Sequence, residues 1–498
     1  MPDQEPTLKL KTARTLKWNT IDRVAAQLIY AAVGIVLANI LSKEDFGLVG
    51  VLLIFQAFAT LLTDGGFGMA LIQKKGTSQT DYSSVFWFNL IVSLAIYGLL
   101  CLGAPVIADI FHDDRRLIPL SRWMFLSFVL NGLSLVHTNK LMKEMNVRMV
   151  AVSNLVALTV AGIAGIILAL MGFGAWALVW QTIINAAVKS LILWSSGSWF
   201  PSFVFSLSSL RSILPVGSSV LLTQILNTIS LYAPNFVIGT YDSLRSLGIY
   251  TQADKWSKMG SATITQILAS SFIPLLSRCA DDNNTRCRYI GRINRFTALI
   301  LMPLLLGLTL VGQPLFHAFF GNKWDDAVVL FQILAFRGIF VVLIQLYYNY
   351  CVAAGRSKAL YLIELAKDGL LIGALLATVW FGSISLIVWG LLAGSVATYL
   401  IVLLITVRQT EYSVRDMLAD MMPFVIIAVG ACVAAYGAGA LIGCVADATA
   451  VSVIGRGWIL LLSEIAVGLL VYVGLLKICR IPELSEMTGY LFGRFRRR

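Results

Sequence analysis

The sequence contains fourteen apolar segments, each of about the length that crosses a lipid bilayer as a helix. They cover residues 18–41, 46–72, 83–108, 118–139, 150–171, 174–195, 212–239, 247–275, 294–316, 327–351, 359–380, 384–407, 418–443 and 454–476. Charged residues make up only 13% of the 498 residues, about half the fraction that is usual in soluble domains. The sequence therefore predicts an all-α polytopic membrane protein with about fourteen transmembrane helices.

The positions of the basic residues predict the orientation of these helices. We count four residues near segment ends with the loops next to them: Arg122, Lys189, Arg295 and Arg456. If the N-terminus is cytoplasmic, 26 of the 38 Lys and Arg residues then fall in cytoplasmic segments, 7 in external segments and 5 deeper within the apolar segments. Because cytoplasmic loops carry an excess of Lys and Arg, we expect both termini in the cytoplasm. The net charge of +12 then reflects membrane topology, and nucleic acid is not an expected partner. A cleaved signal peptide is not expected either, since no short apolar region with a cleavage site follows the N-terminus.

Two parts of the chain, six helices apart, resemble each other. LSKEDFGLVGV (41–51) aligns with YDSLRSLGIYTQA (241–253), which places Gly47 opposite Gly248. MGFGAWALVW (171–180) aligns with WFGSISLIVWG (380–390), which places Gly172 opposite Gly382. An even number of helices per copy gives parallel repeats, a pattern typical of transporters. The alternative is chance similarity between apolar segments. We therefore predict two pseudo-symmetric six-helix lobes followed by two further helices.

This repeat divides the chain into six parts. They are a basic cytoplasmic N-terminus (1–17), an N-terminal lobe (18–195), a cytoplasmic linker (196–211), a C-terminal lobe (212–407), the last two helices (408–476) and a basic cytoplasmic tail (477–498). No connecting segment is long enough for a soluble catalytic domain. Any function must therefore reside among the helices.

Several charged residues lie inside the apolar segments, where each cation costs roughly 2.5–3.5 kcal/mol near the bilayer centre. The cations are Arg23, Lys255, Lys258, Arg337 and Lys367, and the carboxylates considered for ion coupling or for a structural role are Asp22, Asp64, Asp254, Glu364 and Asp368, with Glu464 as a further acid. Such groups need either a partner or a hydrated cavity. They are therefore the main candidates for functional residues.

Two sets of these cations are suited to binding an anion. Lys255 and Lys258 are three residues apart and share a helix face, which suits a diphosphate, while Asp254 is expected to point elsewhere. Arg337 lies midway along its segment, where its side chain cannot easily reach either interface. It should face a hydrated lumen or pair with an acid. For Lys255 and Lys258, and for Asp22 with Arg23 near the cytoplasm, extension of the side chain to the membrane interface is the alternative.

The remaining acids have structural alternatives. Glu364, Lys367 and Asp368 share much of one helix face, which favours an internal ion pair that holds helix packing. Asp64 lies among Gly65, Gly66 and Gly68. Small residues let helices approach closely in membranes. Asp64 therefore either accepts hydrogen bonds in a packed contact or is a protonatable group beside a flexible point.

Three longer segments carry a resemblance to a known family. They are FGLVGVLLIFQAFATLLTDGGFGMALIQKKGTSQTDYSSVFWFN (46–89), FSLSSLRSILPVGSSVLLTQILNTIS (205–230) and FGNKWDDAVVLFQILAFRGIF (320–340). They resemble bacterial polysaccharide-export flippases of the multidrug/oligosaccharidyl-lipid/polysaccharide superfamily, in the branch that includes the colanic acid exporter. The resemblance implies transport of a polyprenyl-diphosphate-linked oligosaccharide across the bacterial inner membrane, for lipopolysaccharide, capsule or exopolysaccharide assembly. It also implies membrane lipids and polysaccharide assembly proteins as partners.

On this interpretation Arg23, Lys255, Lys258 and Arg337 attract the diphosphate, and Gln224, Asn227 and Asn235 contact sugars in a cleft between two rocking lobes. Members of this superfamily are often ion-coupled, and the coupling ion stays open between H⁺ and Na⁺. The scattered cysteines and histidines predict no metal site, and no other cofactor is expected.

Three other functions are alternatives to this one. An ion-coupled multidrug antiporter of the same superfamily would favour an acid-lined pocket. A glycan polymerase or ligase would need a large external loop with catalytic groups, and the short loops here argue against an enzyme. A channel would show rings of charge, which the scattered charges do not form.

Overall fold

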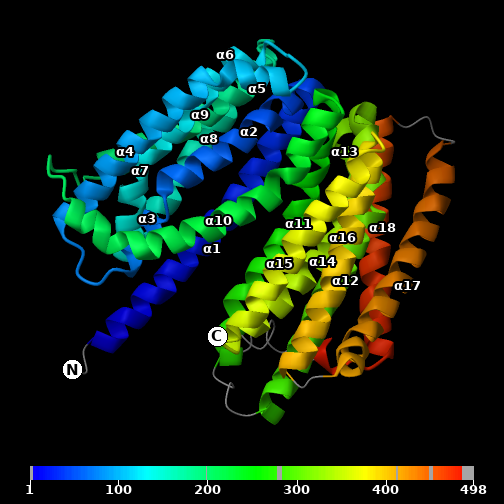
Figure 1. Ribbon diagram of the computed structural model, residues 1–498. Helices are drawn as coiled ribbons and strands as arrows, with labels where there is room; N and C mark the ends of the chain where they lie inside the picture. The colour runs from blue at the N-terminus through cyan, green and yellow to red at the C-terminus, as the bar shows by residue number, and fades with distance from the viewer. Residues whose placement is uncertain (1–3, 198, 278–282, 411–412, 448–451, 485–498) are drawn as a thin grey trace. The chain divides into compact units, whose positions relative to one another are not determined.

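The computed structural model describes residues 4–197, 199–277, 283–410, 413–447 and 452–484 (Figure 1). These residues form eighteen α-helices and one 3₁₀ helix. The chain divides into two compact units, Met1–Gly248 and Ile249–Arg498. The all-α class predicted from the sequence is confirmed.

The first unit is built from α1 to α10 and the first turn of α11. The bounds are α1 (Gln4–Ile40), α2 (Lys43–Asp64), α3 (Phe67–Gln73), α4 (Gln79–Leu102), α5 (Ala104–Ile110), α6 (Leu117–Met124), α7 (Leu126–Lys143), α8 (Val147–Leu170), α9 (Ala175–Ser195) and α10 (Leu207–Tyr241). Helix α8 packs between α1 and α9, and α10 packs against α2, α3 and α4. Leucines such as Leu28, Leu99 and Leu170 are exposed on its outer helices, as expected for side chains that face lipid.

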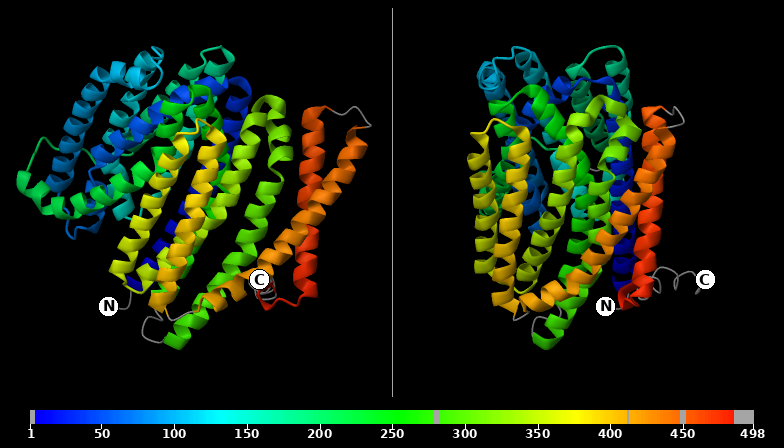
Figure 2. Two further views of the ribbon diagram at one scale, coloured as in Figure 1. Left: turned by 45° about the vertical axis from the view of Figure 1, so that its right-hand side comes forward. Right: turned by 90° about the vertical axis from the view of Figure 1, so that its right-hand side faces the viewer.

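The second unit contains the rest of α11 and the helices that follow. The bounds are α11 (Leu244–Ser277), α12 (Asn283–Leu310), α13 (Gly312–Phe320), η1 (Gly321–Trp324), α14 (Asp325–Ala353), α15 (Ser357–Val379), α16 (Ile384–Thr410), α17 (Val414–Asp447) and α18 (Val453–Ile478). Helix α16 packs against α14 and α15, while α17 packs against α12 and α18 (Figure 2).

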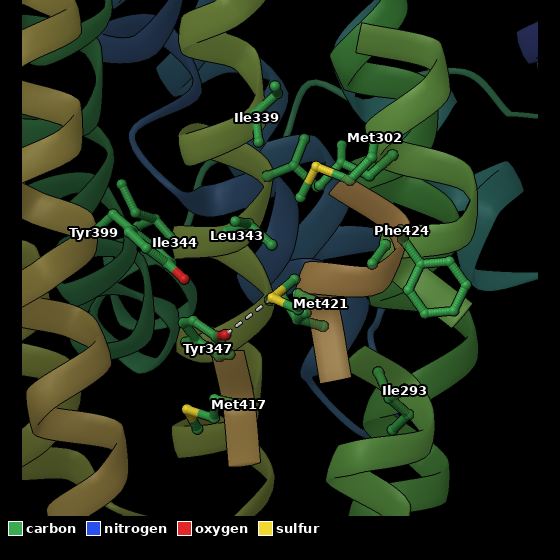
Figure 3. Close-up of a cluster of buried hydrophobic side chains, with 14 of the residues drawn as sticks. Ile293, Met302, Ile339, Leu343, Ile344, Tyr347, Tyr399, Met417, Met421 and Phe424 are labelled. Atoms are coloured by element: carbon green, nitrogen blue, oxygen red, sulfur yellow. Dashed lines mark hydrogen bonds between the residues drawn. The ribbon is translucent and has the colours of Figure 1, made fainter. Parts of the chain in front are cut away.

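A buried cluster joins α12, α14, α16 and α17 in the second unit (Figure 3). Tyr347 of α14 stacks on Tyr399 of α16, with ring centroids 6.0 Å apart. Its hydroxyl donates to the sulfur of Met421 in α17 at 3.7 Å. Both the phenol and the thioether are fully or nearly fully buried. This contact holds the additional helix α17 to the helices of the predicted C-terminal lobe.

Each of the fourteen predicted segments is helical, but some of them are interrupted. The single helix predicted at 46–72 is wrong, because Gly65 and Gly66 adopt left-handed φ values of 53° and 72° and separate α2 from α3. The helix predicted at 83–108 is divided at Gly103, and Pro105 stands in the first turn of α5. Proline is tolerated in a first turn because no helical donor is needed there. The segments 118–139 and 294–316 are likewise each formed by two helices.

Eleven helical segments in the described part of the chain are long and apolar enough to cross a membrane. The predicted segments 212–239, 247–275 and 359–380 are not among them, although they coincide with α10, α11 and α15. These three helices carry many of the charged and amide side chains singled out as site candidates.

The glycines aligned by the predicted repeat adopt matching conformations. Gly172, between α8 and α9, has φ 83°, and Gly382, between α15 and α16, has φ 58°. Positive φ is readily available only to glycine, so both helical hairpins turn in the same restricted way. This similarity supports the internal repeat, while the boundaries of the lobes remain a prediction.

Another aligned pair, Gly47 and Gly248, makes a very close helix crossing within the first unit. A Cβ atom on Gly47 would lie 1.8 Å from the carbonyl oxygen of Leu244, and a Cβ on Gly248 would lie 1.8 Å from that of Lys43. The start of α2 and the first turn of α11 therefore contact each other through their backbones. Ser42 and Asp45 form a capping box that fixes the start of α2 at this crossing.

We predict that Gly47→Ala destabilises the protein, because the new methyl group would clash with backbone and not with a movable side chain. The expected loss is about 1–3 kcal/mol of unfolding free energy, measured as a lower thermal midpoint of the purified protein in detergent. Gly98→Ala in α4 is the control, since an added Cβ there meets nothing within 4 Å. Equal midpoints for the two variants would contradict the close crossing.

Candidate functional site

Arg337 is held inside the second unit by a neutral partner. Its Nε donates a hydrogen bond of 2.8 Å to Oγ of Ser395 in α16, and this hydroxyl donates in turn to the carbonyl oxygen of Leu391 at 2.9 Å. Among the described residues, no carboxylate lies within 4.0 Å of the Arg337 guanidinium. The hydrogen bond to Ser395 fixes the side chain, but none of the described acidic residues forms an ion pair with its positive charge.

Helix α11 approaches α14 next to this arginine. Gly338 lacks a side chain, and a Cβ there would lie 3.4 Å from the Cβ of Ser261. Tyr250, which is 2% exposed, interacts electrostatically with both Asp254 and Arg337. The helix face that carries Tyr250 and Asp254 is therefore close to Arg337.

The expectation that Asp254 points away from the neighbouring lysines is wrong. Its Oδ2 lies 2.6 Å from Nζ of Lys258, because a spacing of four residues brings two side chains to the same face one turn apart. Lys255 instead lies over the ring of Trp256, 5.1 Å from its centroid. The two lysines that were expected to act together thus have different partners.

The charged group of α15 forms the ion pair that the sequence suggested. Lys367 pairs with Glu364 and lies 3.9 Å from Asp368. All three side chains are partly exposed. The pairing neutralises most of the charge of this helix within its own length.

In the first unit, Asp22 connects three helices. Its Oδ1 accepts a 3.0 Å hydrogen bond from Nδ2 of Asn154 in α8, and it interacts electrostatically with Lys189 of α9. Arg23 is exposed on α1. No pattern in the sequence predicts a role for Asn154. Lys189 lies close enough to the end of its helix to suggest an interfacial lysine.

Asp64 lies at the break between α2 and α3. Its Oδ1 accepts a 3.1 Å hydrogen bond from the backbone N–H of Gly68, in the first turn of α3, where backbone donors have no helical partner. A Cβ on Gly68 would lie 2.6 Å from Nδ2 of Asn139 and 2.7 Å from Oδ1 of Asp64. The glycine therefore lets α3 approach both side chains.

The three predicted sugar-contacting amides lie along α10. Gln224 is exposed, Asn227 is half-buried and Asn235 is 9% exposed. Their spacings of three and eight residues put them on one side of the helix. They belong to the first unit with Arg23, whereas Lys255, Lys258 and Arg337 belong to the second. A site that combines the two groups is a proposal.

Comparison with known proteins identifies the fold. The chain is similar to the lipid II flippase MurJ in its inward closed conformation, with a TM-score of 0.72 and 14% identity, over 93% of this chain and 99% of that one. It is 25% identical over 431 residues to the succinoglycan biosynthesis transport protein ExoT of Rhizobium meliloti (strain 1021), covering 84% of this chain and 83% of that protein. It is 24% identical over 402 residues to the teichuronic acid biosynthesis protein TuaB of Bacillus subtilis (strain 168), covering 80% and 82%.

The fold and these similarities define a multi-pass membrane transport protein, not an enzyme. Residues 36–329, more than half of the chain, match the family described as "Polysaccharide biosynthesis protein". The chain belongs to this polysaccharide biosynthesis protein family.

The Asp254–Lys258 pair allows a quantitative test of the site geometry. We expect Asp254→Asn and Lys258→Met each to lower the unfolding free energy, and the double variant to lower it by less than their sum. The expected coupling is about 0.5–1 kcal/mol, since one partner is partly exposed, measured from denaturation midpoints in detergent. Asp254→Asn combined with Lys255→Met is the control and should be additive. Additive behaviour of both combinations would contradict the ion pair.

Proposed function

We propose that the protein is a flippase that moves a polyprenyl-diphosphate-linked oligosaccharide across the bacterial inner membrane during surface polysaccharide synthesis. The observation that carries the proposal is Arg337, a membrane-embedded cation that is bonded to a hydroxyl and, among the described residues, to no acid. A cation held in this way is available to a phosphate group. The polysaccharide biosynthesis family of the protein and the fold that it shares with a lipid II flippase support transport of this ligand.

The chemistry of the substrate explains why such cations would be retained. A diphosphate carries about two negative charges and its glycan is rich in hydroxyl groups, so neither can cross hydrocarbon without a polar path. In the proposed mechanism Arg23, Lys255, Lys258 and Arg337 attract the diphosphate, while Gln224, Asn227 and Asn235 contact the sugars. Two six-helix lobes alternate access to this cationic cleft.

The finer assignments belong to the same proposal. They are fourteen transmembrane helices, both termini in the cytoplasm, and membership in the branch of the colanic acid exporter. The sequence resemblance of the three quoted segments and the distribution of basic residues support them. Coupling to H⁺ or Na⁺ would involve one of the carboxylates Asp22, Asp64, Asp254, Glu364 or Asp368.

We predict that Arg337→Ala reduces export of surface polysaccharide at least about tenfold, because a charge-assisted bond to phosphate is lost. Arg337→Lys should retain part of the activity, since it keeps the charge but not the planar donor group. The measurement is surface polysaccharide in a strain that carries only the variant, normalised to the amount of protein in the membrane.

Lys358→Ala is the matched control, because this lysine is exposed on α15 and should export normally. Wild-type export by a correctly inserted Arg337→Ala variant would contradict the proposal. Drug resistance conferred by the wild-type protein, with unchanged polysaccharide export in its absence, would favour the antiporter alternative.

A further inference from the structure

A large cavity lies entirely within the second unit. It has a volume of about 1030 Å³ and is lined by residues of α12, η1, α13, α14, α16, α17 and α18. Sites for small ligands typically have volumes of roughly 300–1,000 Å³. None of the proposed diphosphate-binding or sugar-contacting residues lines this cavity, so it is a separate candidate site.

Glu464 of α18 is the most unusual group in its wall. It is 7% exposed, and its Oε2 has no hydrogen-bond partner among the described residues. A buried carboxyl oxygen without a donor is costly. The group therefore needs a donor that the described protein residues do not supply.

The opposite helix is shaped to hold this carboxyl in place. Gly439 of α17 faces Glu464 so closely that a Cβ would lie 2.3 Å from Oε1 and 3.0 Å from Cγ and Cδ. Any other residue at position 439 would displace the carboxyl group. The glycine thus lets α18 present Glu464 at the cavity wall.

The other polar groups of the cavity include amide side chains, a histidine–aspartate pair and the guanidinium of Arg456, which also makes an interaction within the protein. Gln332 donates through Nε2 to the carbonyl oxygen of Thr309 at 3.1 Å. Nε2 of His317 lies 3.0 Å from Oδ1 of Asp325. Two aromatic side chains, Trp389 and Tyr436, also line the cavity and are 55% and 65% exposed. The wall therefore offers hydrogen-bond acceptors and donors together with apolar ring faces.

This combination restricts the class of ligand. An alkyl chain would leave the buried oxygen of Glu464 without a donor. A bare anion would meet two acidic side chains, Glu464 and Asp325, against one cation, Arg456. A metal ion prefers several protein ligands, and the described residues contain no group of three or more His, Cys, Asp or Glu placed to hold one. A ligand with many hydroxyl groups and apolar C–H faces satisfies both the carboxyl and the aromatic rings.

We propose that this cavity binds a sugar moiety, with Glu464 accepting hydrogen bonds from its hydroxyl groups and Trp389 and Tyr436 packing against its C–H faces. The existence of the site follows from the cavity and Glu464. Its assignment to the transported glycan rests on the proposed function. The sugar could come from the lipid-linked substrate or from a free oligosaccharide, and the two sources share the chemistry that the cavity recognises.

The test uses the full-length protein in lipid nanodiscs and two probes. One is the intact polyprenyl-diphosphate-linked oligosaccharide of the producing strain, and the other is the oligosaccharide released from it by mild acid. We expect binding of at least one probe by calorimetry. Glu464→Gln should weaken that binding about tenfold or more, because one acceptor oxygen of the carboxyl group is replaced by an amide nitrogen that cannot accept. Gly439→Ala should have a similar effect, because it displaces the carboxyl group.

Gly430→Ala is the matched control in the same helix, since its Cβ would make only an ordinary 3.7 Å contact with Leu475; it should bind within about twofold of wild type. Equal affinity for both probes identifies the glycan alone as the ligand, and binding of the lipid-linked probe only identifies the lipid-linked form. Absence of binding to both probes would overturn the proposal. So would wild-type affinity in both the Glu464→Gln and Gly439→Ala variants, or equal binding of polyprenyl diphosphate without a glycan.

The result of this binding test can be distinguished from the result of the export test of the proposed function. Binding that depends on Glu464, with normal export by Arg337→Ala, would keep the cavity site and reject the cationic path. Loss of export in Arg337→Ala, with no binding of either probe, would reject the cavity site and keep the cationic path.

Discussion

A charged side chain inside a membrane must have a partner or water, and this constraint explains most of the polar contacts in the protein. Lys258 has Asp254 one turn away, and Lys367 has Glu364 in the same helix. Asp22 accepts a hydrogen bond from an amide of another helix. The two ion pairs neutralise charge within their own helices, whereas the Asp22 contact joins α1 to α8. Arg337 differs from them, because a hydroxyl fixes its position without neutralising it.

The glycines of the chain allow the polar contacts to form. Gly68 lets α3 reach Asp64 and Asn139, and Gly439 lets α17 reach Glu464. In each case a Cβ would overlap a polar side chain at less than 3.0 Å. Close approach through small residues is the usual means of helix association in lipid. Here it also determines where charged and amide groups are presented.

Much of the fold could be predicted from the sequence, because apolar length and the distribution of basic residues are strong signals in membrane proteins. All fourteen predicted segments are helical in the structure. The break after Asp64 was missed, since hydropathy continues unchanged from α2 into α3 and only the glycine pair marks the turn. Glycines at the equivalent turns Gly172 and Gly382 were identified from the repeat, and their matching φ values agree with it.

The candidate site was less predictable, because its partners come from different helices. Arg337 was identified by its depth in an apolar segment, but nothing in the sequence pointed to Ser395 as its hydrogen-bond acceptor. Asp254 was placed on the wrong side, since adjacency to Lys255 was weighed above the four-residue spacing to Lys258. Glu464 was noted only as an acid, because its importance depends on Gly439 in a neighbouring helix and on the cavity beside it.

The central claim is that positive charge in the membrane, foremost that of Arg337, recognises the diphosphate of a lipid-linked glycan. It is tested most directly in proteoliposomes by comparing the translocation rates of one glycan carried on polyprenyl diphosphate and on polyprenyl monophosphate. The account predicts that the diphosphate form moves about tenfold faster or more, because it makes an additional charge-assisted interaction. Equal rates for the two forms would contradict it.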